Sequence, residues 1–341
     1  MRSKQFIIGI QVAILAMTAA LSGCGRQAVP EVEPDAEVNV TETAGEDEDV
    51  SAAETAGGDE YVSVTEATGG DADVTVTEAT GEDAEVNVTE TTGEDASLII
   101  TALKGGAADS FALISENHVV VIDTGLEGKA DKLVEFLKEQ GVTKIDELII
   151  THFDKDHVGG ADHIINEFEV GKVYTTYHSK ESDDITEYLA ALEAAGLSET
   201  TVTEKISFAA DNVTYTIYPP QSTSYADSES NNSSLVIRVA AGENSMLFAG
   251  DAEAARINEL LATSGLESTV LKIPHHGRLE TNTAELIEYI DPDYAIITSS
   301  NSEPEDHEVL DILADNGTIT YLTKNGNVTI VMDDNGIAVT Q

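Results

Sequence analysis

Ile149-Ile-Thr-His-Phe-Asp-Lys-Asp-His-Val-Gly-Gly160 ends an apolar strand and then places four candidate metal ligands within six positions. These ligands are His152, Asp154, Asp156 and His157. Two imidazoles and two carboxylates crowded into one turn suit neither a core nor a plain surface, and a cation would relieve the repulsion between the carboxylates. Gly159 and Gly160 then permit close backbone packing. The alternative interpretation is a polar loop with chance spacing.

Short runs rich in Val and Ile lie on both sides of this segment, mostly bounded by Gly, Asn, Asp or Pro, as is typical of strands. The predicted strands are Leu98–Leu103, Phe111–Ser115, Val119–Ile122, Leu148–Thr151, Val170–Tyr174, Val213–Tyr218, Leu235–Val239, Met246–Phe248, Val270–Ile273, Ala295–Thr298 and Val328–Met332. Helical spacing of apolar residues predicts helices over Lys129–Gln140, Ile185–Ala195, Ala252–Thr263 and Ala284–Ile290. The mixture predicts one large α/β domain over residues 98–341, with an ample and mainly aliphatic core because Trp is absent.

The His-x-Asp-x-Asp-His spacing of residues 152–157 resembles a variant of the His-x-His-x-Asp-His signature of the metallo-β-lactamase superfamily. Three further segments resemble motifs of that superfamily in the same order: Val121-Ile-Asp-Thr-Gly125, Phe248-Ala-Gly-Asp251 and Leu271-Lys-Ile-Pro-His-His-Gly277. More narrowly, three segments resemble the domain attached to ComEC-type DNA-uptake channels: Gly106-Ala-Ala-Asp-Ser110, Asn231-Asn-Ser-Ser-Leu-Val-Ile237 and Pro274-His-His-Gly277. The resemblance covers about residues 98–341 and implies a four-layer αββα sandwich.

The resemblance also implies metal-assisted hydrolysis, in which a divalent ion lowers the pKa of bound water from 15.7 towards about 7. The implied metal ligands are His152, Asp154, Asp156, His157, Asp251 and His275, of which His152, Asp156, His157 and Asp251 are also the expected catalytic residues. Asp123 is expected to buttress the metal loop, and His276, Arg278 and Asn232 are expected to contact substrate. The alternative for the last ligand is that His276 binds metal and His275 is the spare histidine.

Departures from the superfamily pattern change the expected metal. Asp154 replaces the usual second histidine, and Asn232 and Ser233 lie where the third motif would supply another. A site with fewer nitrogen and more oxygen ligands favours one or two ions of Mn²⁺ or Zn²⁺ over obligatory zinc. Arg278 stands where related sequences often have Ser, and Pro304 falls at a histidine position, which leaves a site role for His307 open.

The other histidines have no partner at ligand spacing. They are His118, His163 and His178, and we expect them to be structural or solvent-facing.

The charge of the chain is strongly negative and unevenly spread. The formal net charge is −47, and Gln27 to Ala96 contain 22 acidic residues and no Lys or Arg. The remaining 42 acidic and 14 basic residues of the segment 97–341 still give −28. This balance excludes a basic nucleic-acid grip or a polybasic membrane patch as leading interpretations, and it disfavours DNA as a tightly bound partner.

The N-terminal sequence predicts a signal peptide and a lipid anchor. Arg2 and Lys4 precede an apolar stretch that is shorter than a membrane-spanning helix needs. Leu21-Ser22-Gly23-Cys24 then resembles the lipobox of bacterial lipoproteins, which predicts a signal peptide over residues 1–23 and a lipid on Cys24. The expected location is therefore the extracytoplasmic face of the cell membrane, with the membrane as partner. The alternative is an uncleaved signal anchor with an incidental cysteine.

Residues 24–97 are predicted to form a disordered, lipid-anchored acidic linker. Five 12-residue repeats begin at Val38 and recur to Val86, and their Val-x-Val alternation favours strand over only about four residues. Each unit has almost nothing apolar to bury, so the entropy of ordering is not offset. The alternative is a calcium-binding repeat, but the spaced ligand ladder of calcium loops is missing.

Three functions from the sequence are kept for comparison. The first is an extracytoplasmic phosphodiesterase or nuclease that uses metal-activated water on a small or polymeric phosphodiester. The second is hydrolysis of a carbonyl substrate such as a lactam or lactone. The third is a non-catalytic lipoprotein that binds a ligand on the same fold; no protein partner is evident.

Overall fold

The computed structural model describes residues 97–333 and 336–341 in full and, before them, only the backbone of short strands. These strands are β1 (Phe6–Gly9), β2 (Asn39–Glu42), β3 (Ser51–Gly57), β4 (Tyr61–Thr68), β5 (Ala72–Val76) and β6 (Val88–Thr92). The chain divides into two units, Met1–Gly93 and Glu94–Gln341. Cys24, the predicted lipidation site, lies outside the described residues.

The repeat segment contains a four-stranded antiparallel sheet in the order β3-β4-β5-β6. The strands run over five to eight residues, longer than the alternation predicts for one unit. Val and Thr favour strands, and Val64 pairs with Val76 one repeat later. The role of this segment as an acidic linker stays a prediction.

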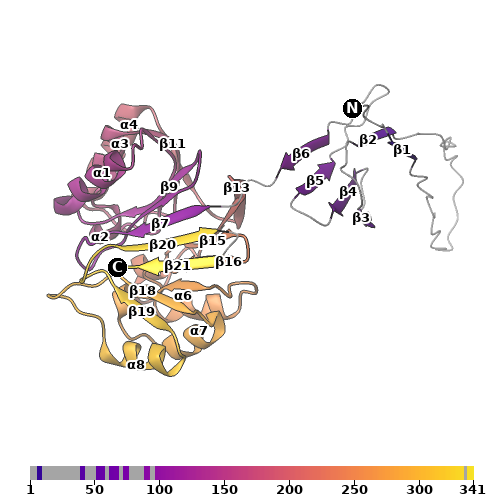
Figure 1. Cartoon of the computed structure of the whole chain (residues 1–341). Coiled ribbons are helices and arrows are strands. Elements are labelled where there is room, and N and C mark those ends of the chain that lie inside the picture. Colours follow the sequence, from indigo (N-terminus) through magenta and orange to yellow (C-terminus); the bar gives the residue numbers. More distant parts are fainter. Residues whose placement is uncertain are drawn as a thin grey trace, which may run out of the picture. The chain divides into compact units, whose positions relative to one another are not determined.

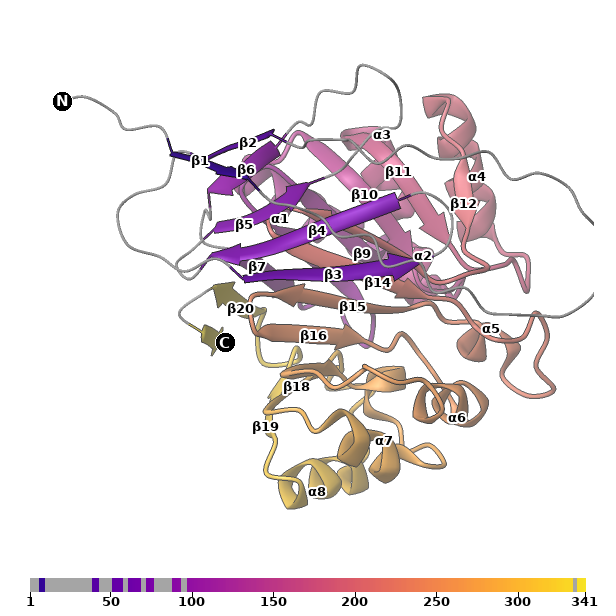
Figure 2. The same ribbon diagram turned by 90° about the vertical axis from the view of Figure 1, so that its right-hand side faces the viewer.

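Two mixed sheets form the centre of the unit Glu94–Gln341 (Figures 1 and 2). The first contains β7 (Leu98–Ala102), β8 (Ser110–Ile114), β9 (Val119–Thr124), β10 (Lys144–Ile150), β11 (Glu169–Thr175), β12 (Glu199–Thr201), β20 (Val328–Asp333) and β21 (Gly336–Thr340). The second contains β13 (Ile206–Ala210), β14 (Val213–Tyr218), β15 (Val236–Ala241), β16 (Asn244–Phe248), β17 (Val270–Lys272), β18 (Tyr294–Ile297) and β19 (Ile319–Leu322). Their strand orders are β12-β11-β10-β9-β8-β7-β20-β21 and β13-β14-β15-β16-β17-β18-β19.

Each sheet joins an antiparallel half to a parallel half. Strands β9 to β12 are parallel in the first sheet, and β16 to β19 are parallel in the second. Parallel neighbours need crossover connections, and most of these are helical here. The helices are η1 (Glu127–Lys129), α1 (Ala130–Glu139), α2 (Lys155–Val158), α3 (Ala161–Glu167), α4 (Asp183–Ala195), α5 (Glu229–Asn232), α6 (Ala254–Leu261), η2 (Pro274–Gly277), α7 (Thr283–Ile290) and α8 (His307–Asp315).

Helices cover both outer faces of the paired sheets. Figure 1 shows α1, α3 and α4 on one side and α6, α7 and α8 on the other. The α1, α3 and α4 side packs on the first sheet through Leu133, Ile164 and Leu192, and the other side packs on the second through residues such as Ile257 and Leu286. This arrangement is the four-layer αββα sandwich that the sequence predicts.

The main core lies between the two sheets and is largely aliphatic. Phe111 of β8 and Phe248 of β16 meet edge to face across it, with ring centroids 5.1 Å apart. Such contacts fix one sheet on the other, which keeps the loops at their shared edge in register.

The four strands absent from the prediction are β12, β13, β19 and β21, and they are the outer strands of the two sheets. None of their described residues is buried. An edge strand is hydrogen-bonded on one side only and needs no fully buried side chains, so its apolar residues are few and give a weak signal.

Among the residues that the structure describes, no helix combines the length and the apolar character that a membrane crossing requires.

Candidate metal centre

The candidate site lies where parallel strands of both sheets end. Asp123 is the second-last residue of β9 and His157 follows β10, while Asp251 follows β16 and His276 follows β17. Asp109 stands directly before β8, whose first residue pairs with the last residue of β9. The carboxyl ends of parallel strands gather side chains at one edge, which is where α/β sheets commonly bind ligands.

His157 is fixed from behind by Asp123. The Nδ1 atom of His157 lies 2.7 Å from Oδ2 of Asp123. The same carboxylate accepts hydrogen bonds from the backbone N–H and the hydroxyl of Thr151, both at 2.7 Å. Asp123 therefore orients the imidazole and ties down the loop after β10, the buttressing position expected from the sequence.

His276 is fixed from behind by a second group. Its Nδ1 atom lies 3.0 Å from the hydroxyl of Thr298 and 3.5 Å from Oδ1 of Asp109. That hydroxyl donates to Asp109 at 2.6 Å. Asp109 also lies 3.8 Å from Nδ1 of His157, so it faces the rear of both rings.

The Nε2 atoms of the two rings point to one place. Nε2 of His157 and Nε2 of His276 each lie 3.2 Å from Oδ2 of Asp251. Nε2 of His276 also lies 3.2 Å from Oδ2 of Asp156. Four donor atoms therefore face one another on the Nε2 side. Ligand atoms of Asp109, His157, Asp251 and His276 also fall within 4.8 Å, but Asp109 reaches the rings at their Nδ1 atoms. We therefore assign Asp109 to support and Asp156 to the donor set.

Lys272 lies beneath this set as a fully buried cation. Its ammonium group contacts Oδ2 of Asp109 at 2.5 Å, the carbonyl oxygen of Gly250 at 2.7 Å and Oδ1 of Asp251 at 3.3 Å. Burial lowers the pKa of Lys272, but the two carboxylates raise it further, so the net shift is upward and the group stays charged.

The donor set fits a divalent cation. Within the described part of the chain, neither the buried Nε2 atom of His152 nor that of His157 makes a hydrogen bond, although Nε2 of His157 faces the carboxylate of Asp251 at 3.2 Å. Buried nitrogen atoms are normally satisfied, so these two are open for a ligand. Imidazole nitrogen and carboxylate oxygen together suit Zn²⁺ and Mn²⁺.

We expect metal binding to release protons. Burial lowers the pKa of His276, but Asp251 and Asp156 raise it more, to about 9. The pKa of His157 is likewise raised well above 6.5, since carboxylate charges outweigh burial. The stability that this proton gives the metal-free protein is full below pH 6.5 and is lost as the pH rises through about 9. Metal affinity should rise across the same window.

Calorimetric titration with Mn²⁺ in two pH 7 buffers of unlike ionisation enthalpy measures this release. We expect about one to two protons per ion, because the metal needs neutral imidazoles. Heats that are equal in both buffers would contradict the expectation.

Three successive residues with left-handed backbone turn the side chains of the adjacent histidines in different directions. His275, His276 and Gly277 have φ values of 47°, 53° and 80°. A Cβ atom at Gly277 would lie 2.8 Å from Cβ of Glu305, so the position has room only for glycine. This turn aims His276 at the donor set, while His275 faces Glu280 at 3.2 Å and Glu253 at 3.6 Å.

The His275 ring therefore points away from the place where the sequence predicted a ligand. His276, predicted to contact substrate, occupies that place instead. The alternative assignment kept open by the sequence is the one that the geometry favours.

A family model described as the metallo-beta-lactamase superfamily matches residues 103–299. The chain belongs to this superfamily. The match spans both halves of the donor set and ends next to Thr298. The resemblance drawn from the motifs is confirmed.

Curated relatives are similar over the same part of the chain. ComE operon protein 3 of Bacillus subtilis is 28% identical over 209 residues, covering 57% of this chain and 26% of the relative. Recombination protein 2 of Haemophilus influenzae is 26% identical over 198 residues, covering 56% and 23%. Competence protein ComA of Neisseria gonorrhoeae is 25% identical over 205 residues, covering 59% and 27%. The chain thus spans about a quarter of the length of each relative.

Solved structures align with part of the chain at low identity. The metallo-beta-lactamase fold protein YhfI from Bacillus subtilis aligns with a TM-score of 0.45 and 12% identity, covering 67% of this chain and 98% of that chain. A diphosphatase from the PhnP family aligns with a TM-score of 0.43 and 13% identity, covering 65% and 94%.

Asp154, which stands at a ligand position of the superfamily signature, makes contacts with other side chains. Its Oδ1 accepts hydrogen bonds from the ammonium group of Lys180 and the hydroxyl of Ser230. His152 is fully buried beside it, with Nε2 3.9 Å from that oxygen and its ring centroid 4.0 Å from that of His157. The sequence predicts both residues as metal ligands. In the structure they border the donor set, and the carboxylate of Asp154 is already paired with Lys180 and Ser230.

Two residues expected to contact substrate are engaged elsewhere. The buried amide of Asn232 donates to the carbonyl oxygen of Asp227 and accepts from the backbone N–H of Arg256. It therefore ties α5 to the start of α6 and has no free face for a ligand. Arg278 is exposed and lies 3.5 Å from Asp306. The predicted substrate contact of Asn232 is not supported, and that of Arg278 would require it to leave this partner.

The remaining histidines lie away from the centre. His118 contacts Glu147 at 2.6 Å, His163 lies 3.7 Å from Asp131, and His178 contacts Glu199 at 2.6 Å. These ion-pair positions agree with the structural or solvent-facing roles predicted for them. His307 begins α8, next to the Asp306 that pairs with Arg278.

Several residues of the centre were not predicted from the sequence. Asp109 and Lys272 stood inside quoted motifs without a role, and Thr298, Lys180 and Ser230 were not singled out. The available signal was a lone charge in an apolar setting, since Lys272 lies inside a strand whose residues are all buried. Such a charge is almost always paired.

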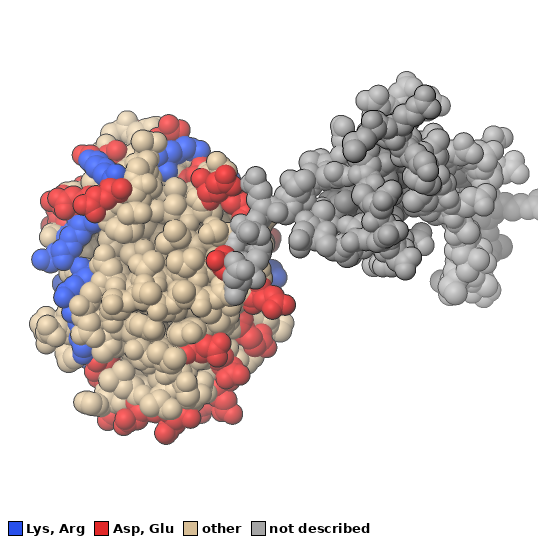
Figure 3. All heavy atoms as spheres, in the orientation of Figure 1, with Lys and Arg blue, Asp and Glu red and all other residues tan. Residues whose placement is uncertain are grey.

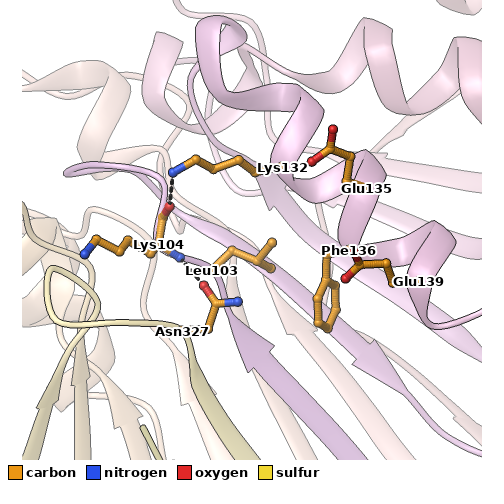
Figure 4. A pocket seen from close by; sticks show the side chains of 7 residues that line it. All are labelled: Leu103, Lys104, Lys132, Glu135, Phe136, Glu139 and Asn327. Carbon is orange, nitrogen blue, oxygen red and sulfur yellow. Dashed lines mark hydrogen bonds between the residues drawn. The ribbon is translucent and has the colours of Figure 1, made fainter.

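One surface hollow lies away from this centre. It has a volume of about 300 Å³ and is lined mainly by β7–β8 loop and α1 residues, including Lys104, Lys132 and Phe136 (Figure 4). Lys132 donates to the carbonyl oxygen of Lys104 across it. None of the superfamily ligand positions lines the hollow, so it is not the candidate site.

Proposed function

We propose that this chain is a metal-dependent phosphodiesterase that acts on the outer face of the cell membrane. The observation that carries the proposal is the meeting of two buried imidazole Nε2 atoms with the carboxylates of Asp251 and Asp156. Imidazole nitrogen and carboxylate oxygen atoms that converge in this way form a ligand set suited to a divalent ion, which can replace the protons that the imidazoles hold in its absence.

The proposed ligands are Asp156, His157, Asp251 and His276, for Mn²⁺ or Zn²⁺. When bound, the divalent ion supplies hydroxide at neutral pH and stabilises charge on phosphoryl oxygens. The chain supplies the orientation. Asp123 holds His157 at its Nδ1 atom, and Asp109 with Thr298 holds His276.

We infer that a substrate approaches from the open side of the centre. The side chains of Asp156 and Asp154 are 24% and 29% exposed, whereas Asp251 and His157 are buried. Asp156 is therefore placed to contact both the cation and a reacting water. Its pKa lies below the ordinary value although burial raises it, because the imidazoles of His276 and His157 favour the carboxylate.

The names of the relatives concern competence and recombination, which supports a phosphodiester as substrate. The net charge of −28 over residues 97–341 opposes tight binding of a polyanion. In Figure 3 the Lys and Arg side chains lie at the edges of the face shown, and its centre carries neither sign of charge. We therefore favour a small or surface-bound phosphodiester over long DNA.

Asp156→Ala tests the hydrolase assignment. We expect turnover of bis(p-nitrophenyl) phosphate with Mn²⁺ to fall on the order of 10³-fold, because hydroxide supply depends on the ion. The metal-free variant should melt at or below the metal-free wild type, because the imidazoles of His276 and His157 favour the carboxylate that is removed. Added Mn²⁺ should stabilise the wild type more than the variant.

Asp131→Ala is the matched control, because its side chain is 87% exposed on α1. If Asp156→Ala kept as much turnover as Asp131→Ala, the candidate metal centre would not be the site of hydrolysis. Hydrolysis of a lactam or lactone without phosphodiester turnover would favour the carbonyl substrate, and neither activity would favour the binding lipoprotein.

Cys24→Ala tests the proposed location. We expect the mature wild type to begin at a diacylated or triacylated Cys24 and to fractionate with membranes. The variant should keep its signal segment uncleaved by the lipoprotein peptidase and carry no acyl mass. Mass spectrometry of the mature N-terminus decides, and an unmodified Cys24 on a membrane-bound mature protein would contradict the anchor.

A further inference from the structure

Two possible cation positions lie side by side in this centre, and their ligand atoms have different partners. The first is the donor set of Asp156, His157, Asp251 and His276. The second lies beside His152 and Asp154, where the motifs imply another ion. Both inferences below rest on the proposed metal-dependent function.

The oxygen atoms of the second position already have cationic or hydrogen-bonding partners. Oδ1 of Asp154 accepts from Lys180 and from Ser230. Oδ1 of Asp251, the oxygen turned away from His157 and His276, faces Lys272 at 3.3 Å. A divalent ion that used these oxygens would meet the repulsion of the ammonium groups.

No further nitrogen ligand completes the second position among the described residues near it. Ser233, one of the two residues at the third-motif position, donates its hydroxyl to the carbonyl oxygen of Ser230 at 2.6 Å. The side-chain nitrogen of Asn232 donates to a backbone carbonyl oxygen and its side-chain oxygen accepts from a backbone N–H. His152 then remains the only unpaired donor that borders this position in the described chain.

The first position has the opposite character. Its two Nε2 atoms and the Oδ2 atoms of Asp251 and Asp156 approach one another at 3.2 Å, and no ammonium contacts those Oδ2 atoms in the described structure. In the first position the imidazoles and carboxylates therefore face one another and no ammonium group, so an ion can enter there in exchange for the imidazole protons.

We propose that the centre binds a single divalent ion in the first position, and that the ammonium group of Lys180 takes the place of a second ion. Lys180 comes from the loop after β11 and its side chain is 36% exposed. Its ammonium group can therefore keep Asp154 and also meet an anionic oxygen of a substrate bound at the ion. A single charge on a flexible stem replaces a fixed second metal.

Lys180→Met tests this placement through metal stoichiometry. We expect equilibrium dialysis of the purified chain against Mn²⁺ to give about one ion per wild-type chain and a second, more weakly bound ion in the variant. Asp154 is then freed beside His152, and Lys272 is the ammonium group that still opposes an ion there. Lys172→Met is the matched control, since Lys172 is an exposed lysine of β11 that pairs with Glu147 at 3.5 Å. It should keep one ion.

Asp154→Ala separates the two positions. We expect this variant to keep the single ion, because Asp154 belongs to the position that Lys180 holds. Loss of the ion in Asp154→Ala would overturn the placement. So would two ions of similar affinity in the wild type, or one ion in Lys180→Met.

Inorganic phosphate tests the anion contact without any turnover. With one equivalent of Mn²⁺, we expect phosphate to bind Lys180→Met about tenfold more weakly than wild type or Lys172→Met, as for loss of one charge-assisted hydrogen bond. Unchanged phosphate affinity would overturn the contact. Absence of phosphodiester turnover with these binding results intact would instead refute only the proposed function.

Discussion

His276→Asn is expected to lower the kcat/KM for a phosphodiester on the order of 10³-fold or more, because a nitrogen ligand to the ion is lost. The same exchange at His275 should change kcat/KM less than about tenfold, since His275 faces Glu253 and Glu280 instead of the donor set. Asn is chosen because it tolerates the left-handed backbone at both positions.

Steady-state kinetics with Mn²⁺, together with metal content by mass spectrometry, measures both variants. Each variant serves as the control for the other, because the two residues are adjacent, both have left-handed backbone and both undergo the same side-chain change. A larger loss of metal and activity in His275→Asn would restore the assignment that the motifs suggested and would contradict the geometry.

Lys272→Met is expected to lower the free energy of unfolding by about 3–5 kcal/mol, the cost of breaking a buried ion pair from one side. The ammonium group is fully buried between Asp109 and Asp251. Without it, two carboxylates remain buried without their cation. Adding Asp109→Asn to the variant should recover part of the loss, because one uncompensated charge is then removed.

Chemical unfolding of the metal-free protein measures this effect. Lys172→Met, whose side chain is 62% exposed, should change stability by less than about 1 kcal/mol. A Lys272→Met variant as stable as Lys172→Met would show that the buried lysine does not neutralise these carboxylates.

The layered fold could be predicted because its inner strands carry apolar runs. β8 and β9, for example, are buried at all positions but one each, and most of their residues are apolar. The outer strands could not be predicted, because β12 and β21 have no buried residues and depend on a neighbour for half of their hydrogen bonds. Helix α8 was missed although Val309 and Leu313 are buried on one face, since its apolar stripe is short.

The location of the site could also be predicted, because strand ends collect ligands and the histidines stand at those ends. The ligand identities were less accessible. The choice between His275 and His276 depends on three successive left-handed residues, which the sequence marks only by Gly277. The pairing of Asp154 with Lys180 joins segments 26 residues apart, and local spacing does not encode such a contact.

Anomalous diffraction from crystals grown with Mn²⁺ tests the metal centre most directly. The predicted result is one strong peak within about 2.0–2.3 Å of Nε2 of His157 and Nε2 of His276, at normal metal–nitrogen distances. It should lie on the side of Asp251 and Asp156, not at the Nδ1 atoms that face Asp109. A peak between Glu253, His275 and Glu280, or no peak beside His157, would contradict the account.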